Sequence, residues 1–269
     1  MTAFAHHLSF EFRIGIRNRQ LLFLTYLFPL VFYLFMGFLM VEINPPFGDV
    51  LIPAMVIFTL LATTLLGLPE LLVGAREQGI FRSYKINGVP SASILAVPAI
   101  TTMMHTAVVS LIIIVSAPLL FDAPVPNNWI NFAVVFVAMA FSAAGLGVLI
   151  GVVSPSSRTT MFLSQMVFIP SILLAGFMIP LSQLPEAFRS VARLLPATHG
   201  VNALNGLAMG NGAEFDPWGS VGVLVVGGLL SFALASYLFS WDSQNSTRRG
   251  HPALAILALV PYLTAIFQF

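Results

Sequence analysis

The chain has 269 residues, of which 58% are hydrophobic and 8% are charged, and its mean hydropathy of +0.95 lies outside the range of soluble domains. The absence of cysteine excludes disulfides, thiol catalysis and cysteine-based metal sites, and a net charge of +1 carried by scattered arginines gives no indication of nucleic-acid binding. Apolar runs long enough to cross a bilayer recur, so the sequence predicts an all-α, polytopic membrane protein with one transmembrane domain over residues 1–269.

The N-terminal segment, residues 1–19, has no small-residue cleavage site after its apolar stretch, and we expect no removable signal peptide. Its apolar residues alternate as in a strand, although several of them also share one stripe of a helix. A lone strand in a bilayer interface would have no partner for its backbone. We therefore expect a helix that lies in the inner interface, with its basic side chains reaching towards water.

Seven apolar runs follow, and we interpret them as six core spans within residues 20–240 and an extra C-terminal span, 252–269. The runs cover residues 20–41, 50–73, 91–120, 129–153, 160–180, 218–240 and 252–269. The third run is longer than one crossing needs, so we expect a tilt or a bend near Pro98. The seventh run is barely long enough to cross.

The basic residues predict the orientation, because cytoplasmic loops carry an excess of Lys and Arg. With a cytoplasmic N-terminus, the cytoplasmic side holds Arg13, Arg17, Arg19, Arg76, Arg82, Lys85, Arg158, Arg248 and Arg249, whereas the other side holds Arg189 and Arg193. We therefore expect a multi-pass protein of the cell membrane, with its C-terminus outside.

Residues 181–215 are of mixed character and contain two short apolar segments, Leu184–Leu195 and Ala197–Met209, which Pro196 divides. Each segment is too short to cross the bilayer, and segments of this length suit a re-entrant or interfacial hairpin. We expect an outer re-entrant helical hairpin that dips into the outer leaflet.

The sequence lacks the motifs of several chemistries. The only lysine lies in Tyr84-Lys85-Ile86, so no Walker A loop is present to hold nucleotide phosphates. No zinc-protease motif or serine-nucleophile elbow occurs either. We therefore expect no enzyme activity, no catalytic residues, no metal site and no cofactor in this chain.

Three polar residues fall inside the predicted spans: Glu70, His105 and Gln165. A carboxylate in a membrane is a functional candidate by default. For Glu70 we favour a structural explanation, either an ion pair with an arginine at the inner rim such as Arg158 or simple snorkelling. His105 fits a neutral, hydrogen-bonded packing residue better than a substrate contact, and Gln165 fits an interhelical hydrogen bond. All three remain candidate residues of a transport pathway.

The fourth run carries a GxxxG pattern at Gly147 and Gly151, which lets two helices approach closely. The partner helix lies either in the same subunit or in a neighbouring one, and the pattern favours neither.

The segment 76–90, REQGIFRSYKINGVP, concentrates charge between two apolar runs. By itself it is explained by the positive-inside rule. Its order of residues, however, resembles a segment between the second and third spans of the permease subunits of type-2 ABC exporters, which move drugs, lipids or polysaccharides outward. Residues 175–185, with a Gly-x-x-x-Pro signature, and Leu195-Pro196-Ala197-Thr198-His199 are similar to the outer signatures of that family. The likeness covers residues 10–240. Six spans are usual in the family, and Asn205 stands where a basic residue is common.

The resemblance implies that residues 76–90 form a coupling helix, which docks on a separate ATP-binding cassette subunit. It assigns Phe81 and Tyr84 as an apolar anchor, with the charged residues setting the register. The ATPase-coupling candidates are Arg76, Glu77, Gly79, Phe81, Arg82, Tyr84 and Lys85, with Ser154 and Arg158 as a second contact.

The resemblance also implies a second permease copy or a homologue, surrounding membrane lipids, and ATP with Mg²⁺ in the partner subunit. We expect no nucleic acid among the partners. The expected cargo is a hydrophobic drug or a lipid-like molecule, as in multidrug efflux or lipid transport. The alternative is an ion-coupled secondary transporter that uses Glu70 and His105.

Overall fold

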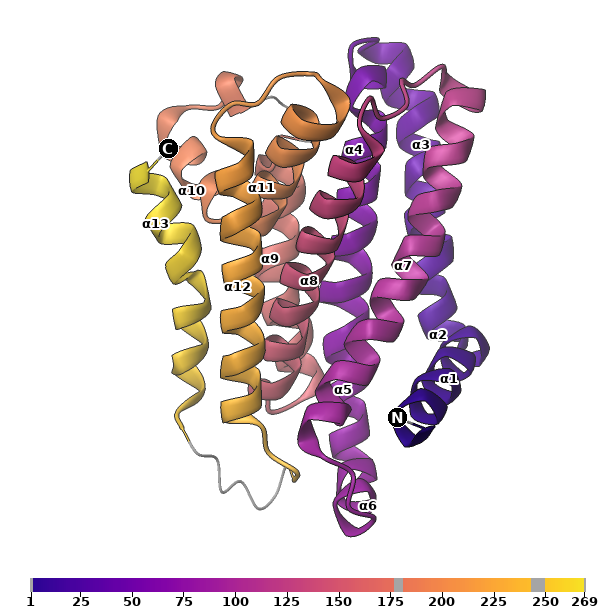
Figure 1. The fold of residues 1–269 in the computed structure, drawn as a ribbon, viewed down its shortest axis with the longest axis vertical. Helices are drawn as coiled ribbons and strands as arrows, with labels where there is room; N and C mark the ends of the chain where they lie inside the picture. Colours follow the sequence, from indigo (N-terminus) through magenta and orange to yellow (C-terminus); the bar gives the residue numbers. More distant parts are fainter. Residues whose placement is uncertain (1, 177–180, 243–249, 269) are drawn as a thin grey trace.

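The computed structural model describes residues 2–176, 181–242 and 250–268, and their regular structure is entirely helical (Figure 1). The helices are α1 (Thr2–Arg17), α2 (Arg19–Leu22), η1 (Phe23–Leu27), α3 (Phe28–Ile43), α4 (Phe47–Leu61), η2 (Ala62–Gly67), α5 (Leu68–Glu77), α6 (Ile80–Ile86), α7 (Ser91–Phe121), α8 (Trp129–Val153), α9 (Ser157–Leu174), η3 (Leu181–Gln183), α10 (Glu186–Arg193), α11 (Pro196–Ala203), η4 (Leu204–Met209), α12 (Pro217–Leu238), η5 (Pro252–Leu259) and α13 (Val260–Gln268). The segments η1, η2 and η4 are π-helical turns, and η3 and η5 are 3₁₀ helices.

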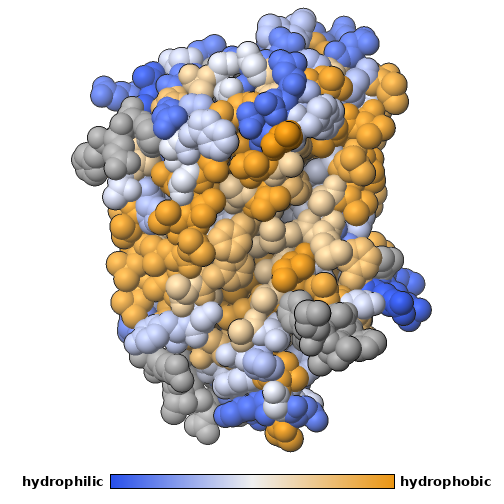
Figure 2. Space-filling view, in the orientation of Figure 1, coloured by the Kyte–Doolittle hydropathy of each residue, from blue (hydrophilic) through white to orange (hydrophobic). Residues whose placement is uncertain are grey.

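Within the described residues, five helical stretches are long and apolar enough to cross a membrane: Phe23–Ile43, Phe47–Glu77, Ser91–Phe121, Trp129–Val153 and Pro217–Leu238. They run side by side, and on the face drawn in Figure 2 apolar residues form a band with polar residues at both ends. The protein is therefore an all-α, multi-pass membrane protein, as the composition predicts.

Two of the predicted spans differ from these five. The fifth run was expected to reach residue 180, but α9 ends at Leu174, and residues 177–180 lie outside the described part of the chain. α9 is 18 residues long and packs against η2 and α5. The seventh run forms a shorter apolar helix, Pro252–Ile266, which lies along α12 and contacts α10. It therefore extends from the α6 end of the bundle towards the α10 end (Figure 1).

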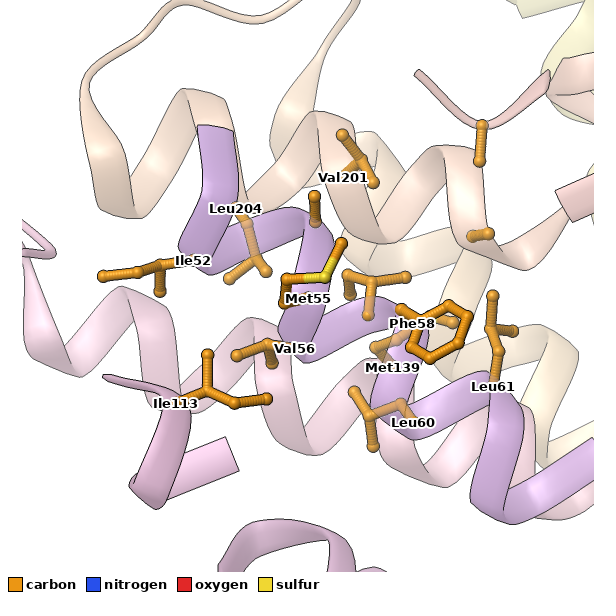
Figure 3. Close-up of a cluster of buried hydrophobic side chains, with 14 of the residues drawn as sticks. Ile52, Met55, Val56, Phe58, Leu60, Leu61, Ile113, Met139, Val201 and Leu204 are labelled. Carbon is orange, nitrogen blue, oxygen red and sulfur yellow. The ribbon is translucent and has the colours of Figure 1, made fainter. Parts of the chain in front are cut away.

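The centre of the bundle is the stretch from α4 to α5. Of its most apolar window, 89% is buried inside the molecule, against 28% for the stretch that ends in α3. Its side chains, among them Ile52, Met55 and Phe58, meet Ile113 of α7, Met139 of α8 and residues of α11 and η4 (Figure 3). A helix that is apolar on all sides can lie in the protein core or face lipid. Hydropathy alone therefore does not place this stretch at the centre, and its position comes from packing against the neighbouring helices.

Two wide turns precede prolines. Proline lacks an N–H group, and its ring collides with the carbonyl group four residues earlier, so the preceding turn must loosen. Pro29 follows the π-helical turn η1, and Pro69 follows η2. α7 continues as an α-helix through Pro98, and the bend or tilt expected there stays a prediction.

The GxxxG pattern of α8 packs within this chain. A Cβ atom on Gly147 would overlap the carbonyl oxygen of Thr64 in η2, and one on Gly151 would lie 3.1 Å from the Cβ of Leu72 in α5. These glycines therefore allow α8 to contact the central stretch directly. Of the two alternatives left open by the sequence, the structure supports packing inside one subunit.

The two short predicted segments form α10 and α11, and α11 starts at Pro196, as expected from the break that proline imposes. All residues of α11 are buried, whereas α10 is largely exposed. Thr198 Oγ1 donates to the Ala192 carbonyl at 2.6 Å and holds the two helices together. That these two helices dip into the outer leaflet stays a prediction.

The N-terminal segment is the helix α1, as expected, and it contacts α7.

Candidate functional site

The charged segment folds into the short helix α6, which projects at one end of the bundle (Figure 1). α5 ends at Glu77, and Gly79 turns the chain with a φ angle of 75°. A Cβ atom there would meet no neighbour within 4 Å, so glycine is required for the backbone angle alone. Gly88, with a φ angle of 72°, ends α6 in the same conformation. The two glycines thus delimit the helix for which the family resemblance implies a coupling role.

Arg76 faces the interior of the protein, although it was expected to contribute to a docking surface. Its side chain is only 4% exposed. Its Nη1 donates to the Val152 carbonyl at 3.0 Å and its Nη2 donates to the Ser154 carbonyl. These carbonyl groups stand at the C-terminus of α8, where helices leave acceptors unsatisfied and favour a positive charge. Arg76 therefore ties the start of the α6 segment to the end of α8.

Phe81 also differs from the prediction that it anchors a partner. It is 4% exposed and packs against Phe239, with ring centroids 5.7 Å apart. The segment that follows α12 thus covers the Phe81 ring. Burial within the chain removes as much apolar surface from water as docking on a partner would. Phe81 holds α6 onto its own subunit and offers no surface for docking.

Arg82 and Lys85 contact the same segment after α12. Arg82 Nη2 forms a salt bridge with Asp242 at a distance of 2.6 Å, and Lys85 Nζ lies 6.0 Å from the centre of the Trp241 ring. Both side chains remain exposed. They orient α6 in the free subunit and still border its outward surface.

The outward surface of α6 contains a residue that the sequence interpretation passed over. Ile86 is 85% exposed, and Glu77 at the end of α5 is also exposed. An isolated apolar side chain at the polar end of a membrane protein is the type of residue that a protein partner buries. Its position directly before Asn87-Gly88, where the helix ends, was the signal available in the sequence.

Ser154 and Arg158, the predicted second contact, behave differently from each other. Ser154 is buried, and its carbonyl group accepts from Arg76. Arg158 is exposed in the first turn of α9, which Ser156 caps by accepting from the Thr159 N–H group at 3.4 Å. Of these two residues, only Arg158 is therefore available at the surface of the protein.

Of the two favoured interpretations of Glu70, the ion pair with Arg158 does not form within the described residues, and snorkelling stays a prediction. Glu70 instead lines a cavity of about 530 Å³ near α6, together with Glu11 of α1 and Tyr84 of α6. Burial raises the pKa of the Tyr84 hydroxyl, and the Glu11 carboxylate, which lines the same cavity, raises it further.

His105 is a packing residue, as the sequence interpretation favoured. Its Nδ1 lies 2.7 Å from the Tyr26 hydroxyl, and its ring stacks on Phe12 with centroids 4.2 Å apart. It therefore joins α7 to η1 and α1.

Gln165 is half-buried on α9 and makes no hydrogen bond to another described residue, so the expected interhelical bond is absent within the described chain.

A bundle of membrane-length helices with a short polar helix at one end and a pair of short helices at the other defines a polytopic all-α membrane protein. The particular family follows from comparison with known proteins. The family model described as "ABC-2 type transporter" matches residues 2–208, and the chain belongs to this family.

Curated relatives agree with this assignment over part of their length. Nodulation protein J of Rhizobium meliloti (strain 1021) is 29% identical over 117 residues, which are 42% of each chain. Nodulation protein J of Rhizobium leguminosarum bv. trifolii is 29% identical over 115 residues, 42% of this chain and 44% of that protein. ABC transporter G family member 20 of Dictyostelium discoideum is 32% identical over 89 residues, 33% of this chain and 12% of that protein. The chain thus matches less than half the length of each relative. No solved structure matches it.

Proposed function

We propose that this chain is the membrane-spanning subunit of an ATP-driven exporter. It forms the translocation pathway and couples to a separate ATP-binding cassette subunit, which supplies ATP and Mg²⁺. The observation that supports this proposal best is the division of α6 into two faces. One face is fixed to the permease by Phe81, Arg82 and Lys85, and the other presents Ile86 to the surroundings.

This division suits the transmission of movement. A force applied to Ile86 reaches α5 through Gly79, and Arg76 connects the end of α5 to the end of α8. The segment after α12 is moved at the same time through Phe81 and Arg82. Packed helices move as rigid bodies, so closure of the ATP-binding subunits would shift three long helices together and change the pathway near α11.

The same proposal includes the remaining partners and the orientation. The α6 end is cytoplasmic and the C-terminus lies outside, in accord with the basic side chains at the α6 end and with an η5–α13 helix that reaches α10. A second permease copy or a homologue completes the pathway, membrane lipids surround it, and no nucleic acid takes part. The cargo is a hydrophobic drug or a lipid-like molecule.

The alternative of an ion-coupled carrier using Glu70 and His105 has less support. Glu70 lines the cavity near α6, but His105 is not part of its described lining. The His105 ring is held between Tyr26 and Phe12. The two groups therefore do not share one site, as a common proton pathway would require.

The test is to purify the tagged chain from its own membranes and to assay the complex for ATP hydrolysis. Ile86→Glu should remove the co-purifying ATP-binding subunit and its hydrolysis, because a charge would be buried without a partner at the interface. Val125→Glu, a similar change in the exposed loop before α8, is the matched control and should retain both. Equal hydrolysis by Ile86→Glu and the control would refute the docking role of α6.

A further inference from the structure

The cavity of about 530 Å³ lies where α1, η1, α5, α6 and the start of α7 meet. Its lining combines apolar side chains, among them Phe10, Leu24 and Leu71, with two carboxylates, Glu11 and Glu70. Gly67 also lines it, and a Cβ atom at Gly67 would meet nothing within 4 Å, so the space continues up to the backbone. A concave, mainly apolar cavity with a few polar groups is the usual form of a small-molecule site.

The charges of this cavity have one sign. Its described lining contains Glu11 and Glu70 but no lysine or arginine. Glu70 is half-buried and makes no hydrogen bond or ion pair with another described residue. A carboxylate that is partly removed from water gains more from a cation than an exposed one does, because the effective dielectric constant is lower. The cavity is thus complementary to a positive charge.

The position of the cavity defines the rest of the ligand. Glu70 lies in the last third of the stretch Phe47–Glu77, towards the polar α6 end of the bundle, while Gly67, about one helical turn earlier, and Leu24 of the span Phe23–Ile43 line the cavity on the side of the apolar spans. An amphiphile in the adjacent leaflet has its head group and its chain at these two levels. We propose that the cavity binds amphiphiles with a cationic head group, whose charge meets Glu70 and whose chain packs on the apolar wall.

A bound amphiphile would also contact the coupling helix. Ile80, Phe81 and Tyr84 of α6 line the same cavity. An occupied cavity would therefore support the inner side of α6, the side opposite to the exposed Ile86. This step rests on the proposed function, since it makes the cavity a site where cargo or a regulatory lipid acts on the coupling helix.

Binding can be measured on the purified full-length chain without any ATPase, so failure here is distinguishable from failure of the proposed function. The probes are pyrene-labelled dodecyltrimethylammonium and pyrene-labelled dodecanol, followed by fluorescence anisotropy. The cation should bind at least tenfold more tightly than the alcohol. Glu70→Gln should reduce the affinity for the cation about tenfold and leave the alcohol unchanged, whereas Glu42→Gln, at an exposed position near the opposite end of the bundle, should change neither.

Gly67→Leu is the second variant, because its side chain would fill the open space that the glycine borders. It should abolish the binding of both probes. The proposal is overturned if both probes bind the unmodified chain equally, if Glu70→Gln retains the affinity for the cation, or if Gly67→Leu still binds as the unmodified chain does.

Discussion

Arg76 and Arg82 lie six positions apart in one basic segment, yet the protein uses them in different ways. The Arg76 guanidinium is buried on the carbonyl groups of Val152 and Ser154, and Arg82 pairs with Asp242 at the surface. Charge density in the sequence indicates that a segment meets water, but not which arginine does so. The partners of Arg76 lie 76 and 78 positions away in the chain, a separation that no local pattern contains.

Arg76→Met tests this interpretation. The substitution keeps the length of the side chain but leaves two carbonyl groups at the end of α8 without their charged donor. Hydrogen bonds to charged groups contribute about 1.5–3 kcal/mol each, so the loss of two should lower the free energy of unfolding by roughly 3–6 kcal/mol. Thermal unfolding of the purified chain measures it. Arg158→Met, at an exposed position, is the control and should unfold like the unmodified chain; equal stability of both variants would contradict the buried role.

At the scale of elements, α10 and α11 are held together by hydrogen bonds from α11 to the carbonyl groups near the end of α10. His199 Nε2 lies 2.8 Å from the Arg193 carbonyl, and Nδ1 is buried without a partner in the described part of the chain. Burial lowers the pKa of His199 to about 4; the hydrogen bond to Arg193 opposes this shift, and the charge of Arg193 adds to it. His199 is therefore neutral in the folded protein at neutral pH.

This shift predicts how stability depends on pH. Between an ordinary pKa of about 6.5 and the folded value of about 4, the unfolded chain binds a proton that the folded chain does not bind. The contribution of neutral, buried His199 to the free energy of unfolding is thus complete above about pH 7. It is lost as the pH falls through this window, by up to about 3 kcal/mol. Thermal unfolding at pH 7.5, 6 and 5 should show a smaller decline for His199→Asn than for the unmodified chain; identical declines would contradict the assignment.

The elements themselves were largely predictable, and the exceptions have physical causes. The runs 129–153 and 218–240 correspond closely to α8 and α12, because a continuous apolar run between polar turns leaves few other solutions. The π-helical turns before Pro29 and Pro69 were missed, although the prolines were visible, since a proline predicts a disturbed turn but not its form. The end of the fifth span at Leu174 was missed because the apolar run continues beyond the helix.

The candidate site could be located from the sequence but not resolved into faces. The charged segment 76–90 contains α6, but the helix itself is limited to Ile80–Ile86. The segment after α12 decides which apolar residue of α6 is exposed, because it covers Phe81 and leaves Ile86 at the surface. The cavity beside Glu70 needs α1 to fold back against α7, a contact between segments far apart in the chain.

At the scale of the whole molecule, the sequence predicts a membrane bundle but cannot say which helix is central. Every span is apolar, so hydropathy does not distinguish the buried stretch from α4 to α5 from α3, which is mostly exposed. Glycines in α8 decide part of the arrangement by allowing contact with η2. The resulting molecule has one end organised around α6 and the other around α11, and we interpret these as the ends where energy enters and where cargo leaves.

The central claim is that a separate ATP-binding subunit docks on the exposed side of α6. Because the chain contains no cysteine, Ile86→Cys introduces a single thiol at the proposed contact, and Val125→Cys introduces one at an exposed loop far from it. Crosslinking in native membranes with a benzophenone maleimide, which couples to the thiol and then photochemically to any neighbouring protein, is the most direct measurement. The account predicts a crosslinked ATP-binding subunit from position 86 and none from position 125; a subunit crosslinked from position 125 alone, or none from position 86, would contradict it.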